Sequence, residues 1–327
     1  MSVYGSQAID NLSAYIDYTY SFDIFSVFLV VTGIYSVLFS YVTLKMIKFY
    51  FENKNSDAWK SVLRPDVFRL FLLMQFWNVF HAFMDFFVVR IPLTGIFTSS
   101  CAEDKPEYLL KTISLIFTGS VYSSHMLTSL FCVQRVALLY THGKRKEKIS
   151  RFFKKLCPVV IIGGHLLGLP HFFVANHCFQ MADPFPFGAV VVTSVILSKS
   201  GSTYAIIYTI FTQTMIATIV GSTLLMFAKL QQKRKSSVEL QTNYNSTAET
   251  TLTATMILIL LPIIVPSLLS IIKLIDYTYY PYLFPLRSIC LDARAHIVSC
   301  YFYFTHPIFK QKAKISGRVV WSSPSSF

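Results

Sequence analysis

Long runs of apolar residues recur along this chain, and they limit its possible folds more than any other feature of the sequence. A helix needs ~20 predominantly apolar residues to cross the ~30 Å hydrocarbon core of a bilayer. Seven segments approach this requirement, at residues 24–44, 68–89, 113–133, 157–173, 204–227, 252–274 and 286–304. The sequence therefore predicts an all-α membrane protein built as a bundle of seven transmembrane helices.

The composition agrees with this prediction. Hydrophobic residues make up 54% of the chain and charged residues only 14%, whereas soluble domains carry about 25% charged residues. The segment 157–173 is short and is broken by Gly163, Gly164 and Pro170, and the segment 286–304 is the most polar. A bundle of six helices, without the last segment, is the alternative.

The positive charges indicate how the chain is oriented. It carries 29 Lys and Arg against 16 Asp and Glu, for a net charge of +13. Twenty-two of the 29 lie in residues 45–69, 134–156, 228–251 and the tail after residue 304. The predicted loops on the other side hold four of them, which are Arg90, Lys105, Lys111 and Lys199.

Lys and Arg concentrate in cytoplasmic loops. Residues 1–23 are therefore predicted to form an extracellular amino terminus, residues 24–304 the membrane domain, and residues 305–327 a cytoplasmic tail. A six-helix chain would place the basic tail outside, so the charges favour seven helices. They also indicate contact with the anionic lipid of the bilayer rather than with nucleic acid.

The predicted outer segments hold two cysteines and a glycosylation motif. Cys101 and Cys178 are the cysteines in outer loops, where the oxidising surroundings allow a disulfide to persist. Such a bridge would tie the second outer loop to the third helix, and two free thiols are the alternative. Asn11 begins an Asn-Leu-Ser sequon and is a candidate for glycosylation.

Polar residues form stripes on the second, third and seventh predicted helices. We predict that a small-molecule ligand binds among Asn78, His81, Asp85, Thr118, His125, Asp292 and His296. Ionisable residues within a membrane usually face the interior of the bundle, so we expect a hydrated site in its outer half. Asp292 and His296 share a helical face at 100° per residue, whereas Arg294 points elsewhere. The alternative is a purely structural role, in which the stripes serve helix packing and each histidine is hydrogen-bonded to a neighbouring residue.

The charged members of these stripes suggest an ion pair within the membrane. Asp85 lies about four residues below the outer end of its helix, and Arg287 enters the seventh helix at a similar depth. Arg294 lies deeper. We predict that Asp85 pairs with Arg287 or Arg294.

Other functional classes find less support in the sequence. A carrier or channel with seven helices is the main alternative, although no internal repeat and no selectivity filter is evident. The chain has neither a metal-binding His-x-x-x-His motif nor a Gly-x-Ser-x-Gly motif, so we predict no enzyme activity, no cofactor and no metal. A catalytic dyad of Asp85 and Asp292 stays open, because only the fold could bring the two together.

Three short motifs resemble those of the nematode serpentine chemoreceptors. They are Arg-Ile-Pro-x-Thr-Gly-Ile at 90–96 with Cys-Ala at 101–102, Ala-Glu-x-x-Leu at 248–252, and Leu-Asp at 291–292 with Tyr-Phe-Thr-His-Pro-Ile-Phe-Lys at 303–310. The resemblance covers essentially the whole chain and is best to serpentine receptor class gamma, and related nematode classes share much of it. It implies a G-protein-coupled receptor in the plasma membrane of chemosensory cilia, which binds a small-molecule cue.

The resemblance also implies a heterotrimeric G protein as the inner partner. The third predicted helix ends in Val-Gln-Arg-Val at 133–136 instead of the Asp-Arg-Tyr of rhodopsin-like receptors, so their switching mechanism cannot be transferred. Arg135 keeps the place where a G protein would bind, and an ordinary topogenic arginine is the alternative. The predicted contact residues are Arg135, Lys229, Lys233, Arg234 and Lys235.

Overall fold

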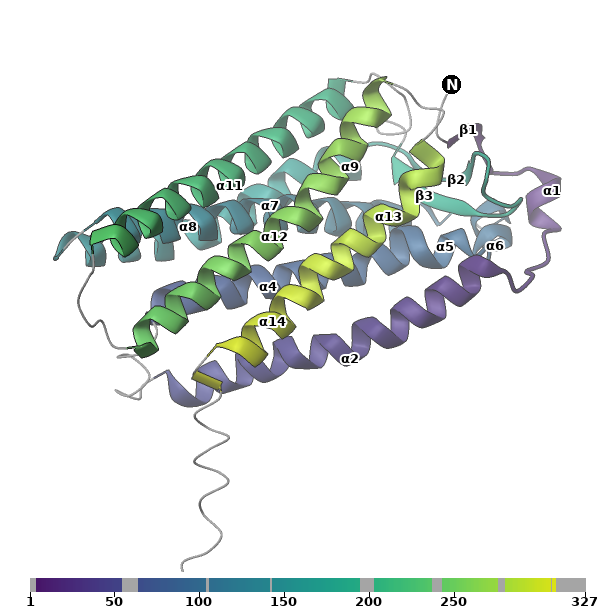
Figure 1. Ribbon diagram of the computed structural model, residues 1–327. Helices are drawn as coiled ribbons and strands as arrows, with labels where there is room; N and C mark the ends of the chain where they lie inside the picture. The colour runs from purple at the N-terminus through teal and green to yellow at the C-terminus, as the bar shows by residue number, and fades with distance from the viewer. Residues whose placement is uncertain are drawn as a thin grey trace, which may run out of the picture.

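Seven long helical segments lie side by side in an elongated bundle, and three short strands lie at one of its ends (Figure 1). This computed structural model describes residues 4–54, 64–103, 106–141, 143–194, 203–236, 243–275, 280–306 and 308–309. Most of the predicted tail, together with Lys105 and Lys199, lies outside the described residues. For Lys233, Arg234 and Lys235 the backbone is described but the side chains are not.

The helical segments agree with the predicted seven-helix architecture. They are α2 (Ile24–Asn53), α4–η1–α5 (Pro65–Asp85, Phe86–Arg90 and Ile91–Leu93), α7 (Glu107–Tyr140), α8–α9 (Arg145–Gly168 and Pro170–Phe173), α11 (Thr203–Ser236), α12 (Asn243–Ile275) and α13–η2–α14 (Tyr280–Asp292, Ala293–Ile297 and Val298–Thr305). The elements η1 and η2 are single π-helical turns within longer helices. Within the described ranges, five segments are long and apolar enough on their own to cross a membrane, and α7 and α13–η2–α14 are not among them.

The polarity of α7 follows from its central position. It packs against α4, α8 and α11, and its buried residues include Ser120, Ser123, Ser124 and Thr128. A helix enclosed by other helices presents little surface to lipid, and small polar residues allow close interhelical packing. Helix α2 is the opposite case, because only 11% of its apolar window is buried. Its many exposed apolar side chains suit a helix that faces lipid.

The glycines of the fourth helix do not interrupt it, so this part of the prediction is wrong. Helix α8 runs unbroken to Gly168 and packs closely on α7. A Cβ atom at Gly164 would collide with Ser123 of α7, and one at Gly168 would lie 3.1 Å from the backbone nitrogen of Gly119. These glycines therefore bring the backbones of the two helices together, as small residues do in membrane bundles. Only Pro170 marks a real change, at the start of α9.

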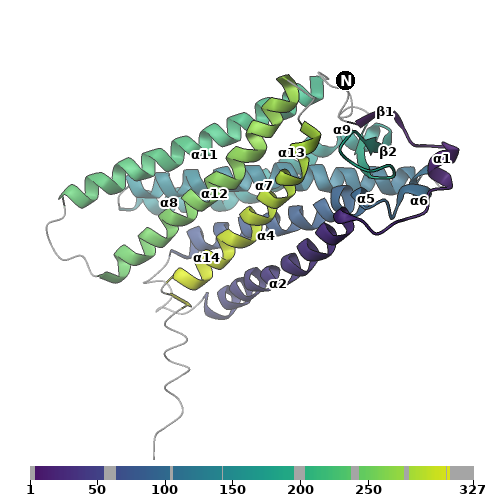
Figure 2. The ribbon, with the colours of Figure 1, turned by 45° about the vertical axis from the view of Figure 1, so that its right-hand side comes forward.

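A small cap closes the end of the bundle to which the strands belong, and we call this the capped end. Strands β1 (Tyr4–Ala8), β2 (Asn176–Met181) and β3 (Val190–Ser194) form an antiparallel sheet in the order β1-β2-β3. Two short helices, α1 (Ser13–Ile16) and α6 (Thr98–Glu103), lie beside it (Figures 1 and 2). The opposite end, where the α7–α8 turn lies, is called the basic end after the many Lys and Arg around that turn.

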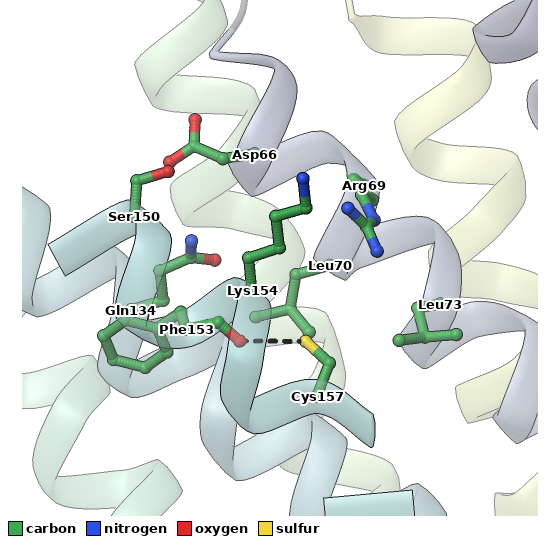
Figure 3. A pocket seen from close by; sticks show the side chains of 9 residues that line it. All are labelled: Asp66, Arg69, Leu70, Leu73, Gln134, Ser150, Phe153, Lys154 and Cys157. Carbon is green, nitrogen blue, oxygen red and sulfur yellow. Dashed lines mark hydrogen bonds between the residues drawn. The ribbon is translucent and has the colours of Figure 1, made fainter. Parts of the chain in front are cut away.

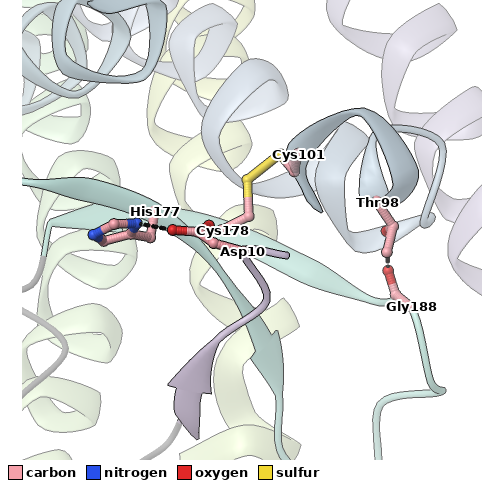
Figure 4. Close-up of a disulfide and its surroundings, with 6 residues drawn as sticks. All are labelled: Asp10, Thr98, Cys101, His177, Cys178 and Gly188. Carbon is pink, nitrogen blue, oxygen red and sulfur yellow. Dashed lines mark hydrogen bonds and ion pairs between the residues drawn. A yellow bond between two sulfur atoms is a disulfide. The ribbon is translucent and has the colours of Figure 1, made fainter. Parts of the chain in front are cut away.

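Three kinds of bond hold the cap together. A disulfide joins Cys101 of α6 to Cys178 of β2 (Figure 4). Beside it, His177 pairs with Asp10, which follows β1. Thr98 donates a hydrogen bond to the carbonyl oxygen of Gly188 in the β2–β3 turn. These bonds link the amino-terminal segment, the loop that contains α6 and the β2–β3 hairpin in one unit.

Asn11, the predicted glycosylation site, lies at the surface of this cap. It occupies the turn before α1 with a φ of 57°, a left-handed conformation that asparagine tolerates better than most residues. Its side chain is exposed, and its backbone N–H bonds to the carbonyl oxygen of Ala102 at 3.0 Å. The sequon is therefore held in place while its acceptor amide remains accessible.

Tyr18 packs across two glycines and explains part of the 90–96 motif. Gly95 and Gly188 have φ values of +81° and +90°, and a Cβ atom on either would collide with the Tyr18 ring. Glycine takes such φ values without steric cost. Thr94 donates a hydrogen bond to the carbonyl oxygen of Ile91 and closes the preceding turn. The motif thus shapes the turn over which the amino-terminal segment lies.

Aromatic rings fill the core toward the basic end. Phe302 of α14 packs against both Phe71 and Phe68 of α4, with ring centroids 4.4 and 5.7 Å away. Phe131 of α7 lies 5.7 Å from Phe71. All four side chains are fully buried, so dispersion and apolar burial join the second, third and seventh helices here.

Candidate functional site

Arg90 lies at the centre of a buried ion cluster near the capped end. Its Nη1 and Nη2 donate to both carboxylate oxygens of Asp292 at 2.8 Å, and its Nε donates to Asp85 at 2.9 Å. Nη2 also donates to the carbonyl oxygen of Ser288 at 3.3 Å. The side chains of Arg90 and Asp85 are 0% exposed. Such paired, hydrogen-bonded geometry is what a buried charge requires.

The π-helical turn η1 makes this pairing possible. In a regular α-helix, residues five apart point about 140° away from each other. The i to i+5 bonding of a π-helix brings them onto one face. Asp85 and Arg90 are five residues apart, and the turn Phe86–Arg90 lies between them. Arg90 also lies over the Phe86 ring, 4.3 Å from its centroid.

This cluster corrects the predicted place of Arg90 and adds a partner to the predicted pairing of Asp85. Arg90 was predicted as an outer-loop residue just past the second helix, but it is 1% exposed and lies within a helix that continues to Leu93. Asp85 was predicted to pair with Arg287 or Arg294. Arg287 does contact Asp85, with its Nη1 3.3 Å from Oδ1, but the closer partner is Arg90. Arg294 is not among its partners in the part of the chain that the structure describes.

The cluster also answers the question of a carboxylate dyad. Asp85 and Asp292 do come together, but each is occupied by Arg90. Ser288 adds a hydroxyl hydrogen bond to Asp85 at 2.8 Å. Two carboxylates held by a guanidinium that lies between them form a bridge between α4–η1 and α13, rather than a pair that shares a proton.

Arg294 lies deeper in the bundle, on the second π-helical turn. Its Nε and Nη2 donate to Asn78 Oδ1 at 3.1 and 2.7 Å, and Ser124 of α7 donates to the same oxygen at 2.6 Å. Arg294 was expected to point away from the face of Asp292, but both are buried, at 3% and 4% exposure. The turn Ala293–Ile297 is π-helical, so the α-helical angle of 100° per residue does not apply across it.

The predicted polar stripes do converge, because Asn78, Ser124 and Arg294 join the second, third and seventh helices at one point. His81 lies beside them, 4% exposed, with its ring 5.5 Å from that of Phe117. Thr118 is buried on α7, and His125 is half-buried with its Nδ1 2.8 Å from the carbonyl oxygen of Val121. Asp85 and Asp292 belong to the Arg90 cluster above.

Some of these polar groups have no bond within the described protein. Among the described residues, neither ring nitrogen of His81 or His296 has a hydrogen-bond partner, nor does Asn78 Nδ2. His296 is 1% exposed, and its ring lies against Tyr35 and Phe39 of α2. Buried polar groups are normally paired, so these positions mark where water or a ligand would complete the structure. No group of three His, Cys, Asp or Glu that could hold a metal occurs in the described ranges.

At the basic end, Arg135 lies beside the closing motif of the chain. It is half-buried on α7, and its charge acts on His306, which is 0% exposed and stacked on Phe302 with centroids 4.8 Å apart. His306 lies two residues beyond the last predicted span. Burial and, as a smaller effect, the charge of Arg135 lower the pKa of His306 to about 4. Lys229 of α11 bonds to Gln232 and lies 5.3 Å from the centroid of the Tyr140 ring.

A small cavity opens between α4, α7 and α8 at the same end (Figure 3). Its volume is about 50 Å³, which is room for a few water molecules. Its lining residues include Asp66, Gln134, Ser150 and Lys154. In the described structure the buried oxygens Asp66 Oδ2 and Gln134 Oε1 lack hydrogen-bond donors, which suits occupancy by water.

Sequence reasoning missed Arg90, Ser288 and Ser124 as members of the site. Arg90 could have been found from the sequence, because it is the first residue of the 90–96 motif and directly follows the apolar segment 68–89. Ser288 precedes Asp292 by one helical turn, but serines at such spacing are common in membrane helices. Ser124 lies off the stripe predicted on the third helix, so no pattern distinguished it.

A seven-helix bundle with a disulfide-braced cap and apolar outer helices defines a multi-pass integral membrane protein. The family model of the serpentine type 7TM GPCR chemoreceptor Sru matches residues 9–312, which include all seven helices. The chain belongs to this family. The predicted all-α, GPCR-like fold is thereby confirmed.

The chain is also similar to serpentine receptor class U-26 of Caenorhabditis elegans. It is 29% identical to this chain over 108 residues, which are 33% of the chain and 37% of the relative. The chain thus matches little more than a third of that protein's length. Both comparisons name class U, so the predicted serpentine chemoreceptor character is confirmed and the narrower assignment to class gamma is not.

Proposed function

We propose that this protein is a chemosensory receptor that binds a small-molecule cue and signals through a heterotrimeric G protein. The observation that carries the proposal is the match of the chemoreceptor family model across residues 9–312. The family is a receptor family, which supports the prediction that the chain is not an enzyme. The proposed location is the plasma membrane of a sensory cilium.

The proposed orientation has the cap outside the cell and the basic end in the cytoplasm. The distribution of Lys and Arg supports it, since positive residues favour the cytoplasmic side. The disulfide Cys101–Cys178 also suits an extracellular cap. The same placement makes Asn11 available for glycosylation. The proposed membrane domain remains residues 24–304.

The proposed ligand site is the polar interior around Asn78, His81 and Arg294. Its support is the set of buried polar atoms without partners described above, which a ligand could satisfy. Thr118 and His125 of α7 and His296 of η2 are further residues that we propose for it. Asp85 and Asp292 act on the site indirectly, because the Arg90 bridge holds α13 against α4. A ligand shifts a receptor only if it binds one helix arrangement better than the other.

The proposed G-protein surface is the basic end. Arg135 lies on α7 and Lys229 on α11, and these two helices pack together at this end. The hydroxyl of Tyr140 on α7 donates a hydrogen bond to the carbonyl oxygen of Leu225 on α11 at 3.2 Å. Lys233, Arg234 and Lys235 extend α11 beyond this contact. The same residues can also bind anionic lipid.

The test is a ligand screen in cells that express the full chain with a panel of Gα subunits, with cAMP, cGMP and calcium as readouts. An active compound should give a response that requires one Gα class and that His81→Ala weakens at unchanged surface level. Phe83→Ala, two residues further along α4 at a position 55% exposed, is the matched control and should respond normally. Movement of a labelled solute without any G protein would instead indicate a carrier or channel and contradict the proposal.

A further inference from the structure

The charges of the bundle are not evenly paired. Arg90 and the half-buried Arg287, whose side chain is 23% exposed, contact the carboxylates of Asp85 and Asp292. Arg294 contacts no carboxylate among the described residues, so its positive charge is in excess of its partners. Among the described residues, its hydrogen bonds go to the neutral oxygen of Asn78 alone. An uncompensated charge at 3% exposure is costly in a membrane interior.

The unpartnered polar atoms beside Arg294 are mostly donors. Asn78 Oδ1 already accepts three hydrogen bonds, and Asn78 Nδ2 has no acceptor among the described residues. His81 is 4% exposed, and its ring N–H likewise lacks an acceptor there. The His81 ring feels the charges of Arg294 and Arg287, so these groups share one region. What the region lacks is therefore an acceptor that carries negative charge.

The surroundings of this region suit an organic group attached to the anion. Phe117 lies between His81, at 5.5 Å from ring to ring, and Arg287, whose Cζ is 5.6 Å from the Phe117 centroid. An aromatic wall next to donors and a guanidinium is the usual composition of a small-molecule site. A planar carboxylate fits the fork of an arginine better than a spherical ion does.

We propose that Arg294, with Asn78 and His81, binds the carboxylate of a small organic acid within the bundle. This inference names the ligand class of the receptor and rests on the proposed function above. The carboxylate accepts hydrogen bonds from the guanidinium, from Asn78 Nδ2 and from the His81 ring, and it neutralises the excess charge. A chloride ion has the same charge, and the experiment separates the two.

The experiment measures thermal unfolding of the purified full-length chain in nanodiscs of zwitterionic lipid, in a sulfate buffer of constant ionic strength. Hexanoate and benzoate are the probes, hexan-1-ol and benzamide are their uncharged analogues, and sodium chloride is a separate arm. We expect the carboxylates to raise Tm by roughly 4 °C at ~100 times their Kd and the analogues to have no effect. Arg294→Gln should abolish this shift, and Arg145→Gln on the exposed face of α8 should keep it.

A second variant tests the charge argument without any probe. Asn78→Asp places a carboxylate where the Asn78 amide oxygen lies, 2.7 Å from Arg294 Nη2. It should raise Tm in the wild-type background, remove the response to hexanoate, and lower Tm in the Arg294→Gln background. A lower Tm for Asn78→Asp in the wild-type background would overturn the proposal, as would stabilisation by chloride alone or equal stabilisation by acids and their analogues. Because no measurement involves a G protein, these failures leave the receptor function itself untouched.

Discussion

Near the capped end, the second and seventh helices are joined by an arginine that lies between two aspartates, whereas near the basic end the same helices are joined by stacked phenylalanines. The first contact is directional and requires three ionised groups in a fixed geometry. The second depends on buried apolar area and shape, and rings can re-pack with only modest cost. Both contacts link α4 to the α13–η2–α14 helix, at different heights along the bundle.

This difference indicates which end can move. A buried ion bridge breaks at a high cost, because each charge left alone stays in a medium of low polarity. A cluster of rings loses only part of its contact energy when it shifts. We therefore expect the capped end to hold its arrangement and the basic end, where Arg135 and His306 lie, to change when the receptor switches. The following predictions test this contrast.

The largest effect should come from Arg90→Met. This change leaves Asp292 without a charged partner and removes the closest partner of Asp85. We therefore expect the free energy of unfolding to fall by about 5 kcal/mol, which is the upper end for a broken buried ion pair. The measurement is the fraction of folded protein at the cell surface and the Tm of the purified chain. Arg145→Gln, at an exposed position, should change neither quantity.

The pairing itself is tested by a double variant. Arg90→Gln with Asp292→Asn removes both charges of one pair, while Asp85 keeps its contact with Arg287. The double variant should be more stable than the sum of the two single changes predicts. Simple additivity would mean that the bridge does not couple the two helices.

Phe302→Ala should have the next largest effect, a loss of about 3 kcal/mol from the lost ring and the cavity left behind. Phe304→Ala, two residues further along the same helix, is the control, because Phe304 is 64% exposed. Chemical unfolding in nanodiscs measures both. If the two variants lost equal stability, the aromatic cluster would not be the contact that holds this end.

Gly164→Ala should lower the free energy of unfolding by about 1–3 kcal/mol, which is the typical effect of overpacking a tight interface. Chemical unfolding in nanodiscs measures it. The added methyl group would collide with Ser123 of α7, whereas at the neighbouring Gly163 nothing lies within 4 Å of the added atom. Gly163→Ala should therefore be neutral or slightly stabilising, since alanine favours helix. Equal effects of the two changes would show that helix propensity, rather than the α7–α8 contact, decides the outcome.

The smallest effect concerns pH at the basic end. The pKa of buried His306 is lowered to about 4, below the ~6.5 of an unfolded histidine. As the pH falls, His306 takes up a proton in the unfolded chain before it does so in the folded chain. The stability gained from keeping His306 neutral is therefore fully present above pH 6.5 and is lost as the pH falls toward 4. We expect a loss of about 1 kcal/mol between pH 7.5 and 5.5. His306→Asn should flatten the stability profile over this interval, and an unchanged slope would exclude His306 as its cause.

Much of the architecture could be predicted from patterns along the chain. Apolar runs close to the length of a bilayer core located seven helices, because a helix satisfies its own backbone hydrogen bonds in hydrocarbon. The cysteines expected in outer loops, Cys101 and Cys178, lie in the disulfide of the cap. The glycines of α8 were misread, since a glycine looks the same in sequence whether it ends a helix or allows a neighbour to approach.

The site was only partly predictable for a similar reason. The stripe of Asn78, His81 and Asp85 lies on regular α-helix, so counting residues placed it on the interior face. Arg90 and Arg294 lie on π-helical turns, which rotate all later side chains relative to an α-helix. A helical wheel therefore assigned Arg294 to the wrong face, and Arg90 was counted as a loop residue.

The sequence by itself determined that the chain crosses a membrane, where its helices lie, and which end carries the positive charges, because these depend on local composition and on the solvent that surrounds each segment. Only the tertiary structure decided which charges meet. The bridge of Asp85, Arg90 and Asp292, and the excess charge on Arg294, depend on two local turns and on contacts between residues about 200 positions apart. Electrostatic energy in a medium of low polarity varies steeply over a few ångströms, and sequence spacing does not specify positions that finely.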